Sequence, residues 1–386
     1  MTLFLFRGAA LTVACWSLVM LTGVGCREGT KAPSADPGGL TALAQAPAAL
    51  NAAPAAPAPT STSLAHSTNE PKEATVASKT DRESEKGRVL EGGRAGSWYP
   101  REPKKAEETL KGFFNANTQH VLDDAIALIV PHAGWRYSGT VAAWAYKAAF
   151  RARLDRVILL APSHQVAMKG KAAVTGAEIY RTPIGDVALD SGTARALASD
   201  ERFALRDGVV EGEHAIEVQM PFLRFALPKV PVVPVVLGSM NVEEAQAFAE
   251  VLRPHVSART LVVVSSDFTH YGPNFGYTPF ADAPVDELQG RVKELDMGAM
   301  MHIERRDLEG FVAYVETTGV TVCGAGPIAL LLALLPEGAK SRLLSYDSSG
   351  RMTGDFTNSV SYFAAALQGS WDPDAQEAAF EMAKWP

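Results

Sequence analysis

Short runs of Val, Ile and Leu recur between about residues 93 and 368 of this chain. Four of them are AIALIV (125–130), RVILLA (156–161), VPVVPVVLG (230–238) and TLVVVSS (260–266). Periodic stretches predict helices at 141–150, 242–252 and 285–301. Continuous apolar strands that alternate with helices are typical of a parallel sheet buried on both faces. The pattern therefore predicts an α/β fold, a single domain with a mostly parallel central sheet flanked by helices.

Histidine or aspartate follows three of these four strands. ALIVPH places His132 after the first run, VILLAPSH places His164 after the second, and LVVVSSDFTH places Asp267 and His270 after the last. Any one of these histidines could be a hydrogen-bonded loop residue. Because the carboxyl ends of parallel strands meet at one edge of a sheet, where such folds bind ligands, the repetition favours one shared site.

The segment EGEHAIEVQMPFL adds more titratable side chains. His214 and Glu217 are three residues apart, which predicts that they share one face of a helix. Glu213 has two interpretations: a carboxylate that starts the helix, or a member of the site.

Cys323 is a further candidate for the site. The segment TVCGAGPIALLLALL runs from a strand-like GVTV (319–322) into Cys323 and then a glycine-rich turn that opens a helix. Cys15 and Cys26 lie near the N-terminus, so Cys323 has no clear disulfide partner, although a bridge to Cys26 stays open. Two histidines and a cysteine from separate loops form a set that binds Cu(I), Zn or Fe(II) and leaves an open position for a substrate.

The ends of the chain have a different composition. Residues 1–26 predict a secretory signal peptide, a lipoprotein signal with Cys26 as the lipidated residue, or a membrane anchor. Residues 27–92 are rich in Ala and Pro and predict a disordered tether, and residues 369–386 form a C-terminal tail. We therefore expect an exported protein, periplasmic or membrane-anchored, attached to the membrane through its N-terminus.

Charge excludes one class of partner. The 386 residues carry a formal net charge of -7, and the one Lys pair, at 104–105, has acidic neighbours. Proteins that bind phosphate backbones need a basic surface, so we expect no nucleic-acid partner.

Eight motifs together resemble one family. They are AGSWYP (95–100), PHAGWRYSG (131–139), APSH (161–164), EIYRTPIG (178–185), EHAIEVQMPF (213–222), VVSSDFTHYG (263–272), VCGAGPI (322–328) and SVSYFAAAL (359–367). In this order they resemble the Memo family, also called AmmeMemoRadiSam system protein B, across about residues 94–367. That family is similar in fold to the class III extradiol dioxygenases.

The resemblance implies a function for several residues. It assigns the metal ligands to His132, His164 and Cys323 and further pocket positions to Asp267 and His270. It also implies copper or iron, redox chemistry and, in some members, peptide binding. The exported N-terminus is unusual for the family and puts in doubt a partnership with radical-SAM proteins.

Two functions follow as expectations. The first is a non-haem, metal-dependent oxidoreductase or dioxygenase-like enzyme acting on a small substrate, with iron or copper most expected and zinc possible. His270 or His214 would act as the acid or base, and Asp267 would orient a histidine or complete the ligand shell. The second is a metal-binding or peptide-binding domain without turnover, tethered to the cell envelope.

Three details qualify these expectations. A His/His/Cys set lacks the carboxylate of common iron oxygenases, so Asp267 or Glu213 would have to supply an oxygen donor. Trp135 and Tyr137 could line the pocket, although core packing is the simpler expectation. Hydrolysis has little support, because no GxSxG motif surrounds Ser265 or its neighbours.

Overall fold

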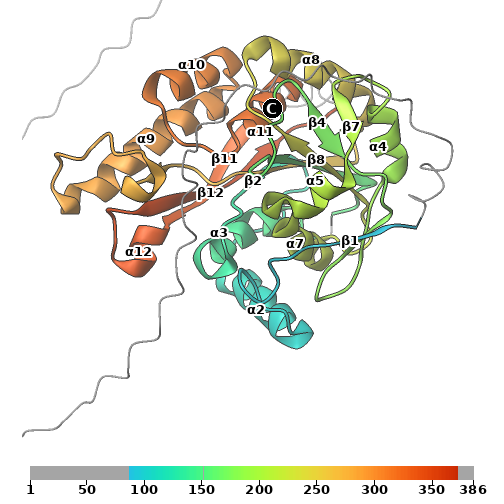
Figure 1. Cartoon of the computed structure of the whole chain (residues 1–386), viewed down its shortest axis with the longest axis horizontal. Helices are drawn as coiled ribbons and strands as arrows, with labels where there is room; N and C mark the ends of the chain where they lie inside the picture. Colours follow the sequence, from blue (N-terminus) through green and yellow to red (C-terminus); the bar gives the residue numbers. More distant parts are fainter. Residues whose placement is uncertain (1–86, 151, 373–386) are drawn as a thin grey trace, which may run out of the picture. The chain divides into compact units, whose positions relative to one another are not determined.

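Four parallel strands form the centre of the main sheet in the computed structural model, which describes residues 87–150 and 152–372 (Figure 1). The predicted signal at 1–26, nearly all of the predicted tether and residues 373–386 of the tail lie outside the described residues. In spatial order the strands are β10 (His270–Tyr271), β12 (Ser359–Gln368), β2 (Ala125–Val130), β9 (Thr260–Ser265), β3 (Arg156–Pro162), β8 (Val232–Leu237), β4 (Ala172–Val174) and β7 (Phe203–Leu205), with β11 (Lys340–Ser348) paired to β12.

The centre of this sheet is parallel and its edges are mixed. β2, β9, β3 and β8 pair in parallel, whereas β12 runs antiparallel to β2, and β4 runs antiparallel to β8. The four predicted apolar runs are these four central strands. The predicted α/β class with a mostly parallel central sheet is therefore confirmed, and antiparallel strands extend it on both sides.

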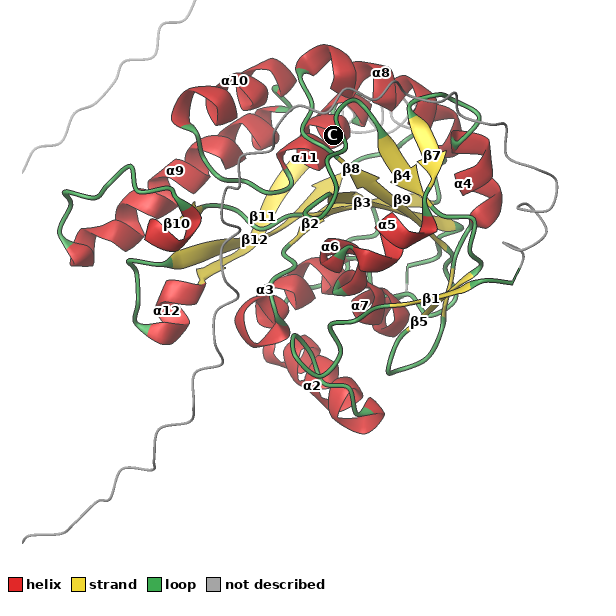
Figure 2. Cartoon of the chain, in the orientation of Figure 1, coloured by secondary structure: helices red, strands yellow, loops and turns green. Residues whose placement is uncertain are grey.

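Helices cover both faces of the sheet (Figure 2). One face carries α4 (Ser191–Leu197), α8 (Val242–Leu252), α9 (Val285–Arg305), α10 (Leu308–Thr318) and α11 (Ala325–Leu334). The other face carries α2 (Pro103–Ala116), α3 (Trp135–Ala148), α5 (Asp207–Gly212), α6 (His214–Glu217) and α7 (Gln219–Ala226). The predicted helices are present, but α3 begins earlier and α9 ends later than the sequence pattern indicates.

Alternate residues of each central strand belong to different cores. In β2, Leu128 and Val130 pack in the core beneath α3, whereas Ala127 and Ile129 pack in the core beneath α11. Successive side chains of a strand point to opposite faces, so a strand buried on both sides must be apolar at every position. This explains the unbroken apolar runs in the sequence.

Smaller elements complete the described part. A second sheet joins β1 (Val89–Glu91), β5 (Ile179–Arg181) and β6 (Val187–Ala188), and α12 (Ser349–Thr353) lies between β11 and β12. Two short 3-10 turns, η1 (Arg253–His255) and η2 (Pro273–Phe275), follow α8 and β10. Within residues 87–150 and 152–372, no helix has the length and apolar character needed to cross a bilayer.

Candidate metal centre

Three neighbouring strands end at the candidate site. β2, β9 and β3 lie side by side and run in the same direction. His132 follows β2, Asp267 follows β9 and His164 follows β3, while His270 lies on the short strand β10. The predicted convergence at one sheet edge is confirmed, because adjacent parallel strands deliver their carboxyl ends to the same place.

Ser265 determines which nitrogen of the buried His132 ring carries the proton. The Ser265 hydroxyl donates to the Ala215 carbonyl at 2.7 Å and accepts from the Gln219 amide at 2.9 Å. Because a hydroxyl has one proton, its 2.9 Å contact with His132 Nδ1 requires the proton to be on Nδ1. His132 Nε2 therefore presents a lone pair. Burial, reinforced by the nearby His164, lowers the pKa of His132 well below its usual value and keeps the ring neutral.

Glu213 orients His164 in the same way. Its carboxylate accepts from the His164 backbone N–H at 2.7 Å and from Nδ1 at 2.9 Å, and it accepts from the Ala215 N–H at 3.0 Å. Burial alone raises the pKa of Glu213, but these hydrogen bonds outweigh burial and lower it to about 2. The ionised carboxylate can only accept, so His164 Nδ1 carries the proton and Nε2 is free. Both sequence interpretations of Glu213 thus hold, since it also starts α6.

Cys323 completes the donor set from the turn before α11. Its Sγ lies 3.3 Å from His132 Nε2 and accepts from the Asp267 backbone N–H at 3.2 Å. Burial, together with the nearby Asp267, raises the pKa of the Cys323 thiol well above its usual value, so a metal ion must displace the thiol proton to bind there. The thiol is free within the described residues, and Cys26 lies outside them.

Two glycines let this turn approach the sheet. A Cβ on Gly324 would collide with the side chain of Ser266, and a Cβ on Gly326 would collide with the Gly238 carbonyl at the end of β8. The turn that carries Cys323 therefore packs directly on the strand ends. The strand predicted at 319–322 is wrong, because the structure has a loop there.

The three predicted ligands form a group that could hold a metal ion. One donor atom from each of His132, His164 and Cys323 lies within 4.8 Å of the other two. Two imidazole nitrogens and a sulfur suit copper, zinc or iron, and both rings are held in the tautomer that leaves Nε2 available. The residues present therefore fit a transition metal, and their chemistry does not select which one.

Asp267 places an oxygen beside this group. Its Oδ1 accepts from the backbone N–H groups of His132 at 2.8 Å and Ala133 at 3.3 Å, and its Oδ2 lies 4.0 Å from His132 Nε2. Burial raises the pKa of Asp267, although His270 and the two N–H groups oppose that shift. Asp267, rather than Glu213, is thus the carboxylate with an oxygen near the donor atoms, because both Glu213 oxygens are engaged by His164.

His270 is held by the loop before Cys323. Its backbone N–H donates to Thr321 Oγ1 at 2.8 Å, and its Nδ1 lies 3.1 Å from the Thr321 carbonyl. Because a carbonyl only accepts, Nδ1 carries the proton and Nε2 is free. The Phe275 ring stands edge-on to His270 with centroids 5.3 Å apart.

His214 lies against the same histidines. Its ring centroid is 4.3 Å from that of His164 and 4.7 Å from that of Trp98, and its Nδ1 is 3.2 Å from the Glu213 carboxylate. His164, Glu213 and His214 form a second group of potential ligands. Burial, with His132 as the next cause, lowers the pKa of His214 to about 3. His214 is therefore neutral and belongs to the wall of the site.

Glu217 does not share the surroundings of His214. Its Oε1 accepts from the Tyr99 hydroxyl at 2.8 Å and from the Arg94 backbone N–H at 2.6 Å. The structure places both residues in the single helical turn α6, three residues apart as predicted, but their side chains have different partners. Glu217 instead fixes the segment that carries Trp98.

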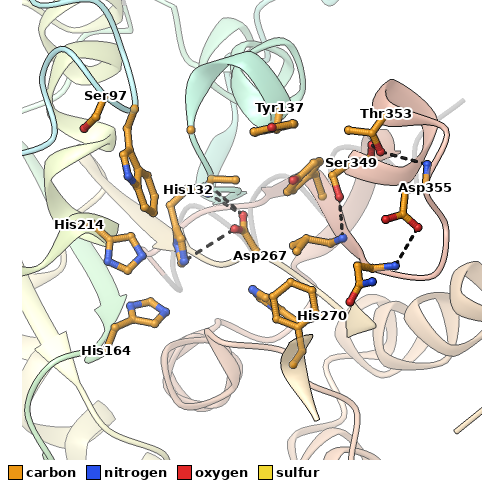
Figure 3. Close-up of a pocket in the computed structure, with 17 residues that line it drawn as sticks. Ser97, His132, Tyr137, His164, His214, Asp267, His270, Ser349, Thr353 and Asp355 are labelled. Atoms are coloured by element: carbon orange, nitrogen blue, oxygen red, sulfur yellow. Dashed lines mark hydrogen bonds and ion pairs between the residues drawn. The ribbon is translucent and has the colours of Figure 1, made fainter. Parts of the chain in front are cut away.

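A cavity of about 560 Å³ opens from the donor set (Figure 3). Its wall includes Tyr137, so the expectation of core packing was wrong for that residue. Trp135 is 2% exposed and packs in the aromatic core, as expected. The other lining residues come from the 97–98 segment, from the ends of the central strands, from α6, β10 and η2, and from the β11–β12 connection and β12 itself. They are Ser97, Trp98, His132, Ala133, Gly134, His164, His214, Asp267, His270, Phe275, Ser349, Thr353, Asp355, Asn358, Val360 and Tyr362.

Several residues that line or support the site carry no signal in the sequence. Gln219 supports Ser265, and the Tyr146 hydroxyl donates to Gln219 Oε1 at 2.9 Å. Gln219 is distant from His132 along the chain, so no local pattern connects them. The cavity side chains between 349 and 358 lie in a polar connection with no apolar run to mark it. The motif AGSWYP was the available signal for Trp98, but motif similarity alone gives no position.

The serines of VVSSDFTH are occupied by backbone groups. Ser265 donates to the Ala215 carbonyl, and Ser266 donates to the Asp267 carbonyl at 2.8 Å while accepting from the Gly324 N–H at 3.0 Å. Neither hydroxyl is hydrogen-bonded to His270. Both hydroxyl protons are therefore committed to backbone carbonyls, and the Ser265 contact with His132 is one in which the hydroxyl accepts.

Comparisons with known proteins match most of the described chain. The family described as Memo-like protein matches residues 91–366. Protein MEMO1 of Homo sapiens is 32% identical over 291 residues, covering 72% of this chain and 96% of its own length. Protein memo-1 homolog of Caenorhabditis elegans is 32% identical over 284 residues, covering 71% of this chain and 81% of its own length.

A solved structure is also similar to this chain. The crystal structure of uncharacterized protein JW3007 from Escherichia coli K12 covers 63% of this chain and 99% of its own, with 12% identity and a TM-score of 0.42. At that TM-score the likeness adds nothing to the topology described above.

Proposed function

Since the chain belongs to the Memo-like protein family, we propose that it binds iron or copper through His132, His164 and Cys323 and carries out redox chemistry on a small substrate. The single observation that carries the proposal is the 3.3 Å approach of Cys323 Sγ to His132 Nε2, with His164 in the same group. Sulfur and imidazole donors gathered this closely, and supported from behind by Ser265 and Glu213, are typical of metal centres. When bound, the metal supplies electron transfer and a Lewis-acid position.

The residues around the donor set support a catalytic role. His270 offers a free Nε2 to the cavity, within reach of a bound molecule, so His270 serves as the acid or base. Asp267 holds the backbone of His132 in place and brings a carboxylate oxygen to the open side of the donor set. His214 and Trp98 close the opposite wall and exclude water from it.

Metal content tests the binding step. The full chain, purified without chelators, should contain about one iron or copper per chain by mass spectrometry, and His132→Ala or Cys323→Ser should lower that content at least about tenfold. His120→Ala is the matched control, because His120 is exposed and lies outside the cavity. A wild-type chain that holds no metal even after anaerobic loading contradicts the proposal.

Turnover distinguishes an enzyme from a binding domain. The metal-loaded chain should consume oxygen only when a suitable reductant or small substrate is present, and His270→Gln should slow consumption while keeping the metal. Stoichiometric metal without any substrate-dependent consumption would instead favour the metal-binding or peptide-binding domain considered above.

A further inference from the structure

The end of the cavity opposite the donor set has its own chemical character. Figure 3 shows Asp355 across the cavity from His164 and His214. Ser349, Thr353 and Asn358 line the same end, and all of these residues belong to the connection between β11 and β12. A ligand that reaches the donor set with one end would place its other end beside this loop.

Asp355 is fixed in this loop as a carboxylate. Its Oδ1 accepts from the Thr357 N–H at 2.9 Å, the Thr357 hydroxyl at 2.6 Å and the Asn358 N–H at 3.3 Å. These hydrogen bonds, led by that of the Thr357 hydroxyl, lower the pKa of Asp355 below its usual value. The side chain is therefore charged at neutral pH and held in one orientation, with Oδ2 outside these loop hydrogen bonds.

No Lys or Arg side chain balances this charge in the cavity. None of the lining residues is Lys or Arg, and the described residues provide no Lys or Arg within ion-pair distance of Asp355. A carboxylate or phosphate at this end of the cavity would meet Asp355 without compensation, whereas a cation would be attracted.

Part of the cavity wall is aromatic. Tyr137, Tyr362 and Phe275 line the cavity, and Figure 3 shows Tyr137 between the histidines of the donor set and the loop. Burial raises the pKa of Tyr362, so that ring stays neutral. Aromatic walls suit a flat or apolar body, and their faces attract cations. A cavity of about 560 Å³ is in the range that encloses a small metabolite.

We propose that the cavity selects small organic amines, with the ammonium group bound by Asp355, the apolar body between the aromatic side chains, and the reactive end directed to the donor set. This inference deepens the proposed function by naming the class of its substrate, and it rests on that function for the reactive end. The selection itself depends on Asp355 and on the absence of Lys and Arg from the cavity lining, not on the metal.

Three probes that differ at one group test the selection. Tyramine, tyrosol and 4-hydroxyphenylacetate share a phenol ring and carry an ammonium, a hydroxyl and a carboxylate. Binding to the full chain, treated with chelator, is measured by isothermal titration calorimetry. We expect tyramine to bind at least about tenfold more tightly than 4-hydroxyphenylacetate, with tyrosol between them.

Variants assign the preference to Asp355. Asp355→Asn keeps an acceptor for the loop N–H groups and should weaken tyramine binding about tenfold with little effect on tyrosol. Asp123→Asn makes the same charge change at an exposed position outside the cavity and should leave all three affinities unchanged. Equal affinities for amine and acid, no detectable binding of tyramine, or an unchanged Asp355→Asn variant would overturn the inference.

The same measurements on metal-loaded protein separate the two proposals. A preference for tyramine in a chain that never holds metal would leave the amine selection intact and remove the redox function. Stoichiometric metal at His132, His164 and Cys323 without a preference for the amine would keep the metal centre and remove the amine selection.

Discussion

At the scale of single residues, the tautomer of His132 depends on the hydroxyl of Ser265. Ser265 is fully buried, and its proton is committed to the Ala215 carbonyl, so it can only accept from His132 and Gln219. A neutral histidine has two tautomers, and this contact selects the one with its lone pair toward Cys323. The nitrogen that His132 leaves free for a ligand is thus set by Ser265, which is not itself part of the donor set.

Removing this hydroxyl should weaken the metal site. Ser265→Ala leaves the Ala215 carbonyl without its donor and frees His132 to take the other tautomer. We expect a loss of about 1–3 kcal/mol in the free energy of unfolding and a 10- to 100-fold weaker affinity for the metal. Competition with a coloured chelator measures the affinity, and urea denaturation measures the stability.

A second buried serine provides the control for Ser265→Ala. Ser361 is fully buried on β12 and contacts the Tyr346 hydroxyl at 3.3 Å, away from the donor set. Ser361→Ala should therefore cost stability without changing metal affinity. If both variants bind metal as the wild type does, Ser265 has only a packing role.

At the scale of elements, the position of α11 decides where Cys323 lies. The first turn of α11 approaches the ends of β8 and β9 so closely that Gly326 and Gly324 leave no room for a Cβ. Most of the helix is buried, which holds it firmly on the sheet. The loop before it also holds His270 through Thr321, so one connection positions two members of the site.

A methyl group at Gly326 should move this helix. Gly326→Ala places a carbon against the Gly238 carbonyl, and relief requires the start of α11 to shift away from β8. We expect about 1–3 kcal/mol of destabilisation and a clear loss of bound metal, because Cys323 moves with the helix. Metal content and thermal unfolding check both effects.

Gly290 on α9 offers the matched substitution. A Cβ there meets nothing within 4 Å, so Gly290→Ala should leave metal binding unchanged and stabilise the helix by up to about 1 kcal/mol. Retention of full metal content in Gly326→Ala would show that the close approach of α11 does not position Cys323.

At the scale of the whole described unit, the donor set joins distant parts of the chain. His132 and Cys323 are 191 residues apart in sequence, and His132 follows β2, whose residues pack in both cores, on opposite faces of the sheet. A ligand that binds only the folded state stabilises it by mass action. Metal bound to these side chains would therefore stabilise the fold as a unit.

Metal removal should lower the melting temperature. At a free metal concentration of about 100 times the Kd, binding contributes about 2.7 kcal/mol, which corresponds to a shift of roughly 4–5 °C in Tm for a domain of this size. Chelator treatment should abolish the shift and reloading should restore it. Cys323→Ser should show no shift in either state, whereas an equal shift in that variant would place the stabilising metal elsewhere.

The residues that follow apolar strands were predictable, because a parallel sheet fixes where its strands end. His132, His164, Asp267 and His270 could be grouped on that ground alone. Cys323 follows no strand: the segment 319–322 has strand-like composition but forms a loop whose Thr321 binds His270. Local composition cannot reveal this, since the competing hydrogen bonds come from a segment about fifty residues away.

By itself, the sequence determined the α/β class and the four central strands, because burial on both faces demands unbroken apolar runs. It also determined the edge of the sheet at which His132, His164 and Asp267 lie. Only the tertiary structure decided which nitrogen of each histidine is free, since Ser265 and Glu213 act through contacts across the fold. It also decided that Asp355 lies across the cavity from the donor set, as Figure 3 shows. Those features depend on distances between residues far apart in the chain, which no local pattern encodes.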